Sequence, residues 1–141
     1  SIPFTLRAAT EKCGINKSIS SFTIPLGATI NMDGTAIMQG CATFFLASLY
    51  GIDLGMSEIL TIVVTATIAS IGTAGIPSAG IIMLTVIFTQ IGIPLEGITL
   101  LLGVDRLLDM MRTSINVSGD LCISCIVASS ENRIDETIYK S

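Results

Sequence analysis

The sequence DRLLDMMRTSINVSGD, residues 105–120, places several charged and amide side chains inside an otherwise apolar stretch. Their spacing of three or four residues puts them on one side of a helix. A charged group costs roughly 2.5 to 3.5 kcal/mol at the centre of a bilayer, so such a row persists only beside partners, ions or water. A set of ion pairs that merely holds helices together is the simpler alternative. The row consists of Asp105, Asp109, Arg112, Asn116 and Asp120.

The composition of the whole chain is typical of a membrane protein. Of its 141 residues, 50% are hydrophobic and 13% are charged, against roughly 25% charged residues in soluble proteins. The mean hydropathy is +0.79. A net charge of -4 argues against a nucleic-acid partner, and the lack of histidine together with four scattered cysteines argues against a zinc site. We therefore expect a protein of the cell membrane that contacts lipid.

The basic residues gather near the two ends of the chain. Between residues 18 and 130 the only cations are Arg106 and Arg112. By the positive-inside rule both ends are predicted to be cytoplasmic, which requires an even number of crossings and hence a multi-pass topology. The chain starts with Ser1, Ile2 and Pro3 rather than a targeting segment, so we expect it to be part of a longer protein.

Two pairs of sulfur-containing residues in the apolar stretch 97–130 are interpreted as packing residues. Cys122 and Cys125 have the spacing of a redox motif, but they lie in an apolar helical pattern without a thioredoxin-like context. Met110 and Met111 are pliable side chains of the kind that fills irregular gaps. Neither pair predicts a chemical function.

Residues 18–52 form the first apolar block, with Asp33 as its only charge. As one straight helix this block would be about 52 Å long, well beyond the hydrocarbon thickness of about 30 Å. The length therefore predicts a broken helix, with the break at Asn31-Met32-Asp33-Gly34-Thr35. Asn and Asp compete for backbone hydrogen bonds there, and glycine resists helix propagation.

The second apolar block, residues 59–95, has no charge and is interrupted by GTAGIPSAG at residues 72–80. Its flanking segments would span only about 20 and 24 Å as helices, short of a full crossing. A re-entrant hairpin fits these lengths, with a tip of small residues that lets the backbone approach a ligand. An ordinary pair of short helices, in which the glycines serve only close packing, is the alternative.

The chemistry of the polar row indicates a ligand with charges of both signs. The guanidinium of Arg112 is permanently charged, and its planar fork matches a carboxylate with two parallel hydrogen bonds. Asp109 lies nearly one turn away on the same side, where it can hold an ammonium group. An amino acid fits this pair better than a plain dicarboxylate does. The alternative is that Asp109 and Arg112 pair only with each other.

Three motifs, in this order along the chain, resemble those of the sodium-coupled glutamate/aspartate transporters of the dicarboxylate/amino acid:cation symporter family. They are NMDGT at 31–35, SIGTAGIP at 70–77, and DMMRT at 109–113 with Asn116 and Gly119-Asp120. The resemblance covers nearly the whole chain. It implies an all-α membrane protein, the C-terminal part of the transport domain, built from broken transmembrane helices and a re-entrant helical hairpin.

The resemblance divides the chain into five segments. Residues 1–14 would be the end of a first re-entrant hairpin, 18–50 a broken span, 57–93 a second re-entrant hairpin, 97–130 the last span and 131–141 a cytoplasmic tail. The polar composition of that tail predicts that it is frayed.

The resemblance also implies which residues bind the substrate and the sodium ions. Hard oxygen donors at interrupted helices suit such ions. Substrate contacts would come from Arg112, Asp109, Thr113, Asn116, Thr35 and the backbone of Ile76 and Gly80. One sodium site would use Asp120, Asn116, Asn31 and the Gly27 carbonyl, a second would use Thr29 with the backbone of Ser70, Ile71 and Thr73, and Asp33 with Asn31 would belong to a third. The tip of the second hairpin would be an extracellular gate.

Together with these residues, the resemblance implies secondary active symport of acidic amino acids, glutamate or aspartate, coupled to sodium by elevator-type alternating access. With the upstream remainder of the chain, the full-length protein is expected to form a homotrimer. Symport of dicarboxylates or neutral amino acids, and coupling to protons, are the alternatives. An integral membrane enzyme using Asp109 or Asp120 as acid or base is less favoured, because no nucleophile with an adjacent base is present.

Overall fold

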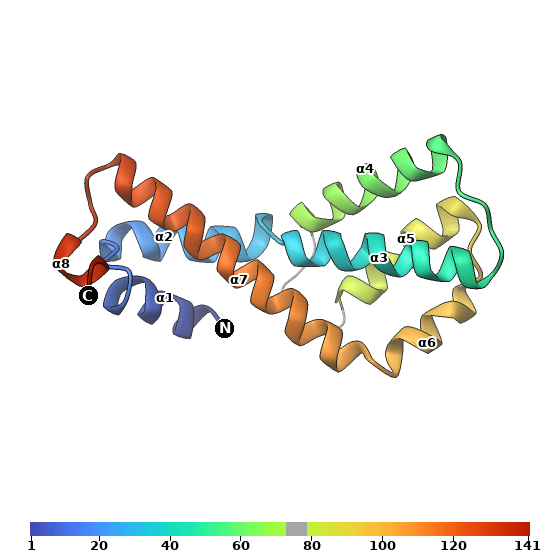
Figure 1. Cartoon of the computed structure of the whole chain (residues 1–141), viewed down its shortest axis with the longest axis horizontal. Helices are drawn as coiled ribbons and strands as arrows, with labels where there is room; N and C mark the ends of the chain where they lie inside the picture. Colours follow the sequence, from blue (N-terminus) through green and yellow to red (C-terminus); the bar gives the residue numbers. More distant parts are fainter. Residues whose placement is uncertain (73–78) are drawn as a thin grey trace.

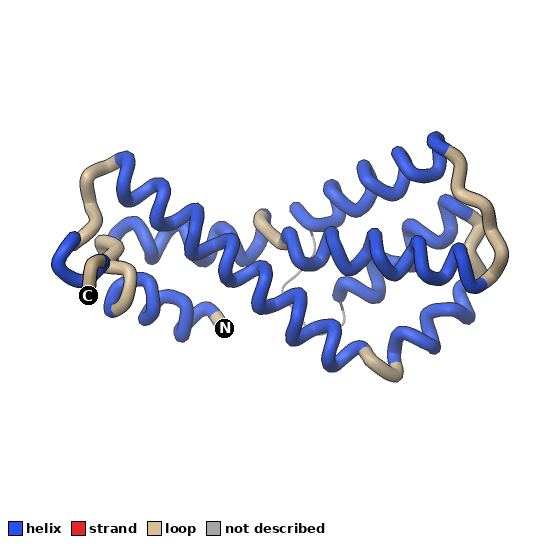
Figure 2. The backbone as a smooth tube through the Cα atoms, viewed as in Figure 1, coloured by secondary structure: helices blue, strands red, loops and turns tan. Residues whose placement is uncertain are grey.

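The computed structural model describes residues 1–72 and 79–141, which form helices joined by short turns (Figure 2). No β-strand occurs within these ranges, and Ile15 forms a single isolated bridge with Ile134. The prediction of an all-α fold is therefore confirmed. In chain order the helices are α1 (Ile2–Glu11), α2 (Lys17–Ile30), α3 (Asp33–Leu49), α4 (Met56–Gly72), α5 (Ala79–Ile91), the 3₁₀ helix η1 (Leu95–Gly97), α6 (Ile98–Leu102), α7 (Asp105–Ser130) and α8 (Glu136–Tyr139).

Helices α2 and α3 follow the long axis of the molecule, and α7 crosses them diagonally near their junction (Figure 1). Helices α4, α5 and α6 gather around α3 at one end, whereas α1 and α8 lie near α2 and the end of α7 at the other. Each end has its own hydrophobic core. Leu46 and Phe88 are buried in the larger core, and Ala9 and Ile24 in the smaller. The polar row of α7 consequently faces the junction between the two cores.

The chain leaves the helical conformation at Asn31 and Met32, within the first apolar block. Their ψ angles are 65° and 62°, far from the helical value of about −42°. Asp33 then starts α3, where a negative charge is favourable at the positive end of the helix dipole. The block therefore contains two separate helices, and their role in crossing a membrane stays a prediction.

Helices α4 and α5 pack against each other on either side of the predicted hairpin tip. Thr65 Oγ1 donates a 2.9 Å hydrogen bond to Gln90 Oε1 between them. Most of the tip, residues 73–78, lies outside the described residues, and with it Thr73 and Ile76. The re-entrant placement of this pair stays a prediction.

The last apolar segment, residues 97–130, is not one continuous helix. A turn at Gly103 and Val104 separates α6 from α7, and the N–H of Val104 bonds the carbonyl of Leu101 at 3.1 Å. Glycine favours such an interruption because it loses more conformational freedom in a helix than other residues do. Helix α7 leaves this turn at a sharp angle to α6 and passes across the junction of α2 and α3 (Figure 1), against both of which it packs.

The prediction that the tail after residue 130 is frayed is wrong. The N–H of Asn16 bonds the carbonyl of Arg133 at 3.0 Å, and the N–H of Asp135 bonds the carbonyl of Gly14 at 2.8 Å. The short helix α8 follows, and the side chain of Asp135 caps its first turn. These bonds join the tail to the turn after α1, a partner that the tail's own composition does not reveal.

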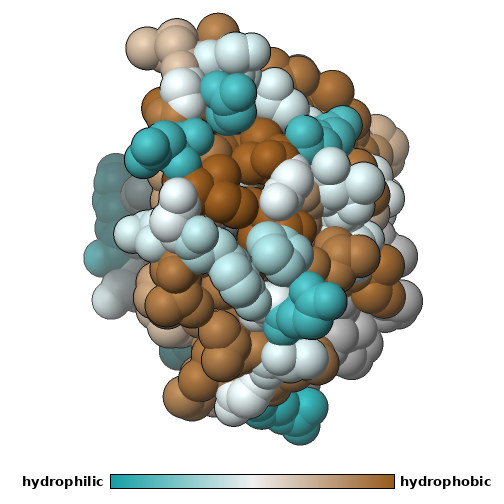
Figure 3. Space-filling view, turned by 90° about the vertical axis from the view of Figure 1, so that its right-hand side faces the viewer, coloured by the Kyte–Doolittle hydropathy of each residue, from teal (hydrophilic) through white to brown (hydrophobic). Residues whose placement is uncertain are grey.

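Many large apolar side chains lie on the outside of the molecule. Phe22, Ile37, Leu60, Ile68 and Leu107 are each more than half exposed. Figure 3 shows the end formed by the connections around α3 to α6, where hydrophobic surface is interrupted by scattered hydrophilic groups. Apolar surfaces of this extent mark contacts with membranes or proteins. Over residues 1–72 and 79–141, no helix has both the length and the apolar composition of a membrane span.

Candidate functional site

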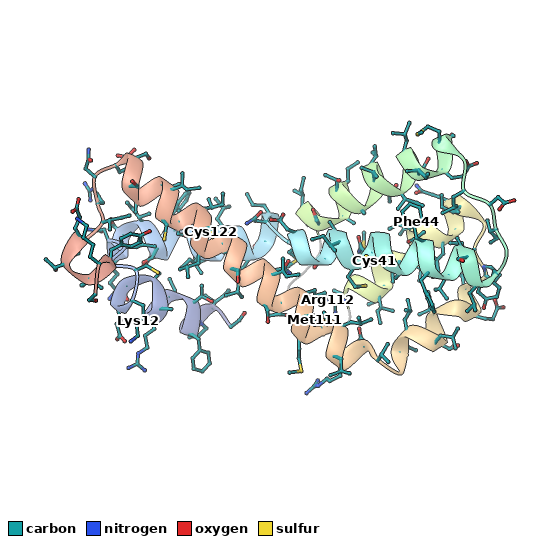
Figure 4. All side chains as sticks on the ribbon, viewed as in Figure 1. Lys12, Cys41, Phe44, Met111, Arg112 and Cys122 are labelled. Carbon is teal, nitrogen blue, oxygen red and sulfur yellow. The ribbon has the colours of Figure 1, made fainter. Side chains whose placement is uncertain are left out.

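Arg112 is the buried cation of the polar row, with 5% of its surface exposed. It lies where α7 passes α3 (Figure 4). Its Nη2 and Nε atoms donate to Asp109 Oδ1 at 2.7 and 3.1 Å, and Nη2 is 3.7 Å from Asp105 Oδ1. The three side chains meet because the helical period brings them to one side of α7. The pairing of Arg112 with Asp109 is the contact that the simpler interpretation of the sequence predicted.

The remaining guanidinium nitrogen of Arg112 faces the start of α5. Within the part of the chain that the structure describes, Nη1 is buried and has no hydrogen-bond partner. A β-carbon added to Gly80 would lie 2.6 Å from Nη1 and 3.2 Å from Met38 Cε. Only glycine leaves room for the guanidinium here. An unpaired buried donor costs about 1 to 3 kcal/mol, and more when it is charged, so an anionic acceptor at Nη1 would be strongly favoured.

Asn116 joins α7 to the first turn of α3. Its Oδ1 accepts from the N–H of Gly34 at 2.8 Å, and its Nδ2 donates to Thr35 Oγ1 at 3.3 Å. The first N–H groups of a helix have no partner within the helix, and an amide side chain can both accept and donate. A β-carbon on Gly34 would overlap the backbone of Arg112. The structure thus brings Thr35, Asn116 and Arg112 together, and Thr113 lies half-buried beside them.

A second polar group surrounds Asp120, one turn beyond Asn116 on α7. Asp120 is 4% exposed, and its Oδ1 accepts a 3.2 Å hydrogen bond from Asn31 Nδ2. Gly27 lies so close that a β-carbon there would overlap the same oxygen. Asp33 is exposed but borders the group, since a β-carbon on Gly119 would lie 3.4 Å from Asp33 Oδ2. Carboxylate and amide oxygens therefore gather at the junction of α2 and α3.

Three predicted ion ligands lie outside this group. Thr29 is exposed, and its hydroxyl donates to the carbonyl of Pro25 at 3.3 Å. Ser70 is buried near the end of α4, where its hydroxyl donates to the carbonyl of Thr67 at 2.7 Å, and Ile71 beside it is exposed. Among the described residues, no three His, Cys, Asp or Glu side chains form a metal-binding group.

Comparison of the sequence with known proteins assigns the chain to a family. The sequence model of the sodium:dicarboxylate symporter family matches residues 1–130. The chain belongs to this family. The resemblance inferred from the three motifs is thereby confirmed, and so is its assignment to transporters rather than enzymes.

The relatives of this symporter chain include several excitatory amino acid transporters. Mouse excitatory amino acid transporter 3 is 49% identical to it over 119 residues, human excitatory amino acid transporter 2 is 50% identical, and rat excitatory amino acid transporter 1 is 46% identical over the same length. The alignments cover 84% of the chain and between 21% and 23% of each relative. The chain therefore spans less than a quarter of the length of those transporters.

Gln39 is a buried polar residue beside Arg112 that the sequence did not single out. It is fully buried in α3, and its Nε2 donates to the carbonyl of Gly80 at 3.3 Å. Its Oε1 is buried without a hydrogen-bond partner in the described ranges. Gln39 therefore ties the start of α5 to α3 beside Arg112. The sequence feature that could have indicated it is a single amide side chain among the apolar and small residues 34–49.

Proposed function

We propose that the full-length protein is a sodium-coupled symporter of acidic amino acids. The side chain of Arg112 supports this function best. It is buried, Asp109 holds one edge of its guanidinium, and Nη1 faces Gly80 without a partner among the described residues. A buried guanidinium with a free N–H group favours a carboxylate, because charge-assisted hydrogen bonds are about twice as strong as neutral ones. The names of the relatives also support an excitatory amino acid as substrate.

In the proposed binding mode, Arg112 binds the side-chain carboxylate of the substrate and Asp109 binds its amino group. Asp109 is suited to this exchange of partners, because its side chain is 32% exposed while that of Arg112 is 6% exposed. The carboxylate can therefore turn toward a ligand while the guanidinium stays in place. The further contacts that we propose are Thr113, Asn116, Thr35 and the backbone of Ile76 and Gly80.

We propose that sodium ions bind around the junction of α2 and α3. The contact of Asp120 with Asn31, and the closeness of Gly27, support a first site that also includes Asn116. A cation there would balance the charge of a carboxylate that is almost fully buried. A second site would use Thr29 with the backbone of Ser70, Ile71 and Thr73, and a third would include Asp33 with Asn31.

Asn116 is the physical link between the proposed substrate and sodium sites. It lies one turn from both Arg112 and Asp120, and its amide bonds the first turn of α3. An ion that fixes the start of α3 would therefore also fix the helix that packs against Arg112. In the full-length protein, we propose that this unit moves as a transport domain in an elevator-type mechanism. The protein would be a multi-pass membrane homotrimer completed by the upstream part of the chain and surrounded by lipid.

Uptake of labelled aspartate by the full-length protein in liposomes tests this function. An inward sodium gradient is expected to drive accumulation, whereas a potassium gradient of the same size is not. Accumulation driven by a proton gradient alone would favour the proton-coupled alternative. Preferred uptake of succinate or serine would favour a dicarboxylate or a neutral amino acid symporter. Aspartate uptake that ignores the sodium gradient would remove the coupling.

Replacing Arg112 by Cys separates substrate recognition from the rest of the transport cycle. Arg112→Cys is expected to abolish aspartate uptake and to retain uptake of neutral amino acids, because the side-chain carboxylate loses its partner. Arg106→Cys is the matched control, since Arg106 is an exposed arginine on the same helix. Undiminished aspartate uptake by Arg112→Cys would contradict the assignment.

A further inference from the structure

The turn after α1 is held against the end of α7 by its backbone. The N–H of Ile15 bonds the carbonyl of Ala9 at 2.9 Å, and Ile15 also forms a bridge with Ile134, which follows α7. Ala9 of α1 and Ala128 of α7 are fully buried in the same core cluster. These contacts fix residues 13–16 relative to the last turns of α7.

Two cysteines meet at this junction. Cys13 lies in the turn after α1, and Cys125 lies on α7 one turn before Ala128. Both are unbridged and half-buried, and both pack against the core cluster that contains Ala128. Both therefore lie against the same four buried residues, Ala9, Ile15, Ile24 and Ala128, which brings the two side chains near each other. Partial exposure also leaves the pair accessible to a small reagent.

We propose that Cys13 and Cys125 form a reversible disulfide that fastens the turn after α1 to α7 under oxidising conditions. Disulfide formation requires two cysteines on neighbouring backbone segments, and here the turn after α1 and the end of α7 are held together by the contacts above. The bridge would close a loop that contains most of the chain, and long loops give the largest restriction of the unfolded state. This modification is independent of the proposed transport function.

The oxidation proceeds by exchange with a small disulfide such as oxidised glutathione. One cysteine thiolate attacks the glutathione disulfide, forms a mixed disulfide and releases one glutathione thiolate. The second cysteine thiolate then displaces the other glutathione and completes the bridge. Two cysteine thiols are oxidised, one disulfide is reduced, and the two glutathione thiolates take up the two protons. Both ends of the chain are predicted to be cytoplasmic, so the bridge would mark an oxidising shift in a normally reducing compartment.

Two other uses of these thiols agree less well with the structure. A soft metal ion would need further ligands, and the described residues contain no group of three metal-binding side chains. Cys122 lies on α7 one turn from Cys125, but it is exposed on the helix surface (Figure 4). Cys125, like Cys13, packs against the core cluster that contains Ala128, whereas Cys122 is not part of that packing.

Peptide mapping of the full-length protein tests the bridge directly. The protein is incubated with oxidised glutathione, its free thiols are alkylated, and it is digested with trypsin without reduction. Cleavage at Lys12 and Lys17 releases residues 13–17, and cleavage at Arg112 and Arg133 releases residues 113–133. A disulfide-linked pair of these two peptides is expected, and dithiothreitol should separate it.

Single substitutions identify the sulfur atoms that are joined. The linked pair should persist in Cys122→Ser and in Cys41→Ser, and it should be absent from Cys125→Ser and Cys13→Ser. Glutathione attached separately to each cysteine, without any linked pair in the unsubstituted protein, would overturn the proposal. A linked pair that survives in Cys125→Ser but is lost in Cys122→Ser would overturn it as well. The experiment on the unsubstituted protein needs no variant to fold.

Discussion

Gly80 of α5 and Arg112 of α7 lie in direct contact, although 31 residues separate them in the sequence. A β-carbon at Gly80 would be 2.6 Å from Nη1 and 3.2 Å from Cζ of the guanidinium. Gln39 donates to the carbonyl of the same glycine, so α3, α5 and α7 converge at this point. The position of the guanidinium therefore depends on the lack of a side chain at residue 80.

Gly80→Ala is expected to raise the KM for aspartate about tenfold or more, which corresponds to about 1.4 kcal/mol of lost interaction. The added methyl group would displace the guanidinium, since Met38 blocks the other side of the same space. Uptake kinetics in liposomes measure the change. Gly40→Ala on α3 is the matched control, because no described atom lies within 4 Å of a β-carbon at Gly40. Equal effects of the two substitutions would show that the contact with Arg112 is irrelevant to transport.

Asp109→Asn tests whether this carboxylate binds the substrate's amino group or serves only as a partner of Arg112. The proposed role predicts weaker transport of aspartate and a smaller loss for succinate, which has no amino group. A structural partner alone predicts equal losses for both compounds, because the same guanidinium would be misplaced in each case. Competition of unlabelled succinate with labelled aspartate measures the ratio. Asp53→Asn, at an exposed acidic residue away from the site, should leave both unchanged.

Gly27→Ala is expected to raise the sodium concentration needed for half-maximal aspartate uptake. A β-carbon at residue 27 would overlap Asp120 Oδ1 and push this carboxylate away from Asn31. Sodium titration of uptake at fixed aspartate measures the shift. Gly40→Ala on α3 serves as the control, because a β-carbon there has no neighbour within 4 Å among the described residues. An unchanged sodium dependence in Gly27→Ala would argue against an ion site at Asp120.

Asn116→Ala is expected to destabilise the protein by about 1 to 3 kcal/mol, because the N–H of Gly34 loses its acceptor at a partly buried position. The hydroxyl of Thr35 also loses its contact with the amide. Thermal unfolding of the detergent-solubilised protein measures the effect. Ser114→Ala is the control on the same helix, since its exposed hydroxyl bonds only the carbonyl of Met110. A melting temperature equal to that of the control would contradict the role of the amide.

Gly14→Ala is expected to destabilise the junction between the tail and α1 by more than the backbone strain of about 1 to 2 kcal/mol. Gly14 has a φ of +65°, and a β-carbon there would lie 2.5 Å from the carbonyl oxygen of Asp135. Gly51 has a φ of +66°, and nothing in the described part of the chain lies within 4 Å of the added atom, so Gly51→Ala isolates the strain alone. The difference between their melting temperatures measures the clash. Equal values would mean that the tail is not docked at Gly14.

The features that the sequence predicted best are those set by neighbouring residues. The helical class follows from the length of the apolar blocks and from the resemblance, and the polar row of α7 follows from the helical period. Asn31 and Met32 leave the helical conformation in a motif whose side chains compete for backbone hydrogen bonds. The family followed from three motifs in order, because such motifs keep residue types that one site requires together.

By itself, then, the sequence determined the helical class, the row of charged groups on one helix and the family. Only the tertiary structure decided that Arg112 contacts Gly80 and Asp109, that Gln39 joins the site, and that the tail pairs with the turn after α1. These contacts join residues far apart in the chain. They depend on how α5, α7 and the tail pack against the rest of the molecule, and local backbone preferences do not encode that packing.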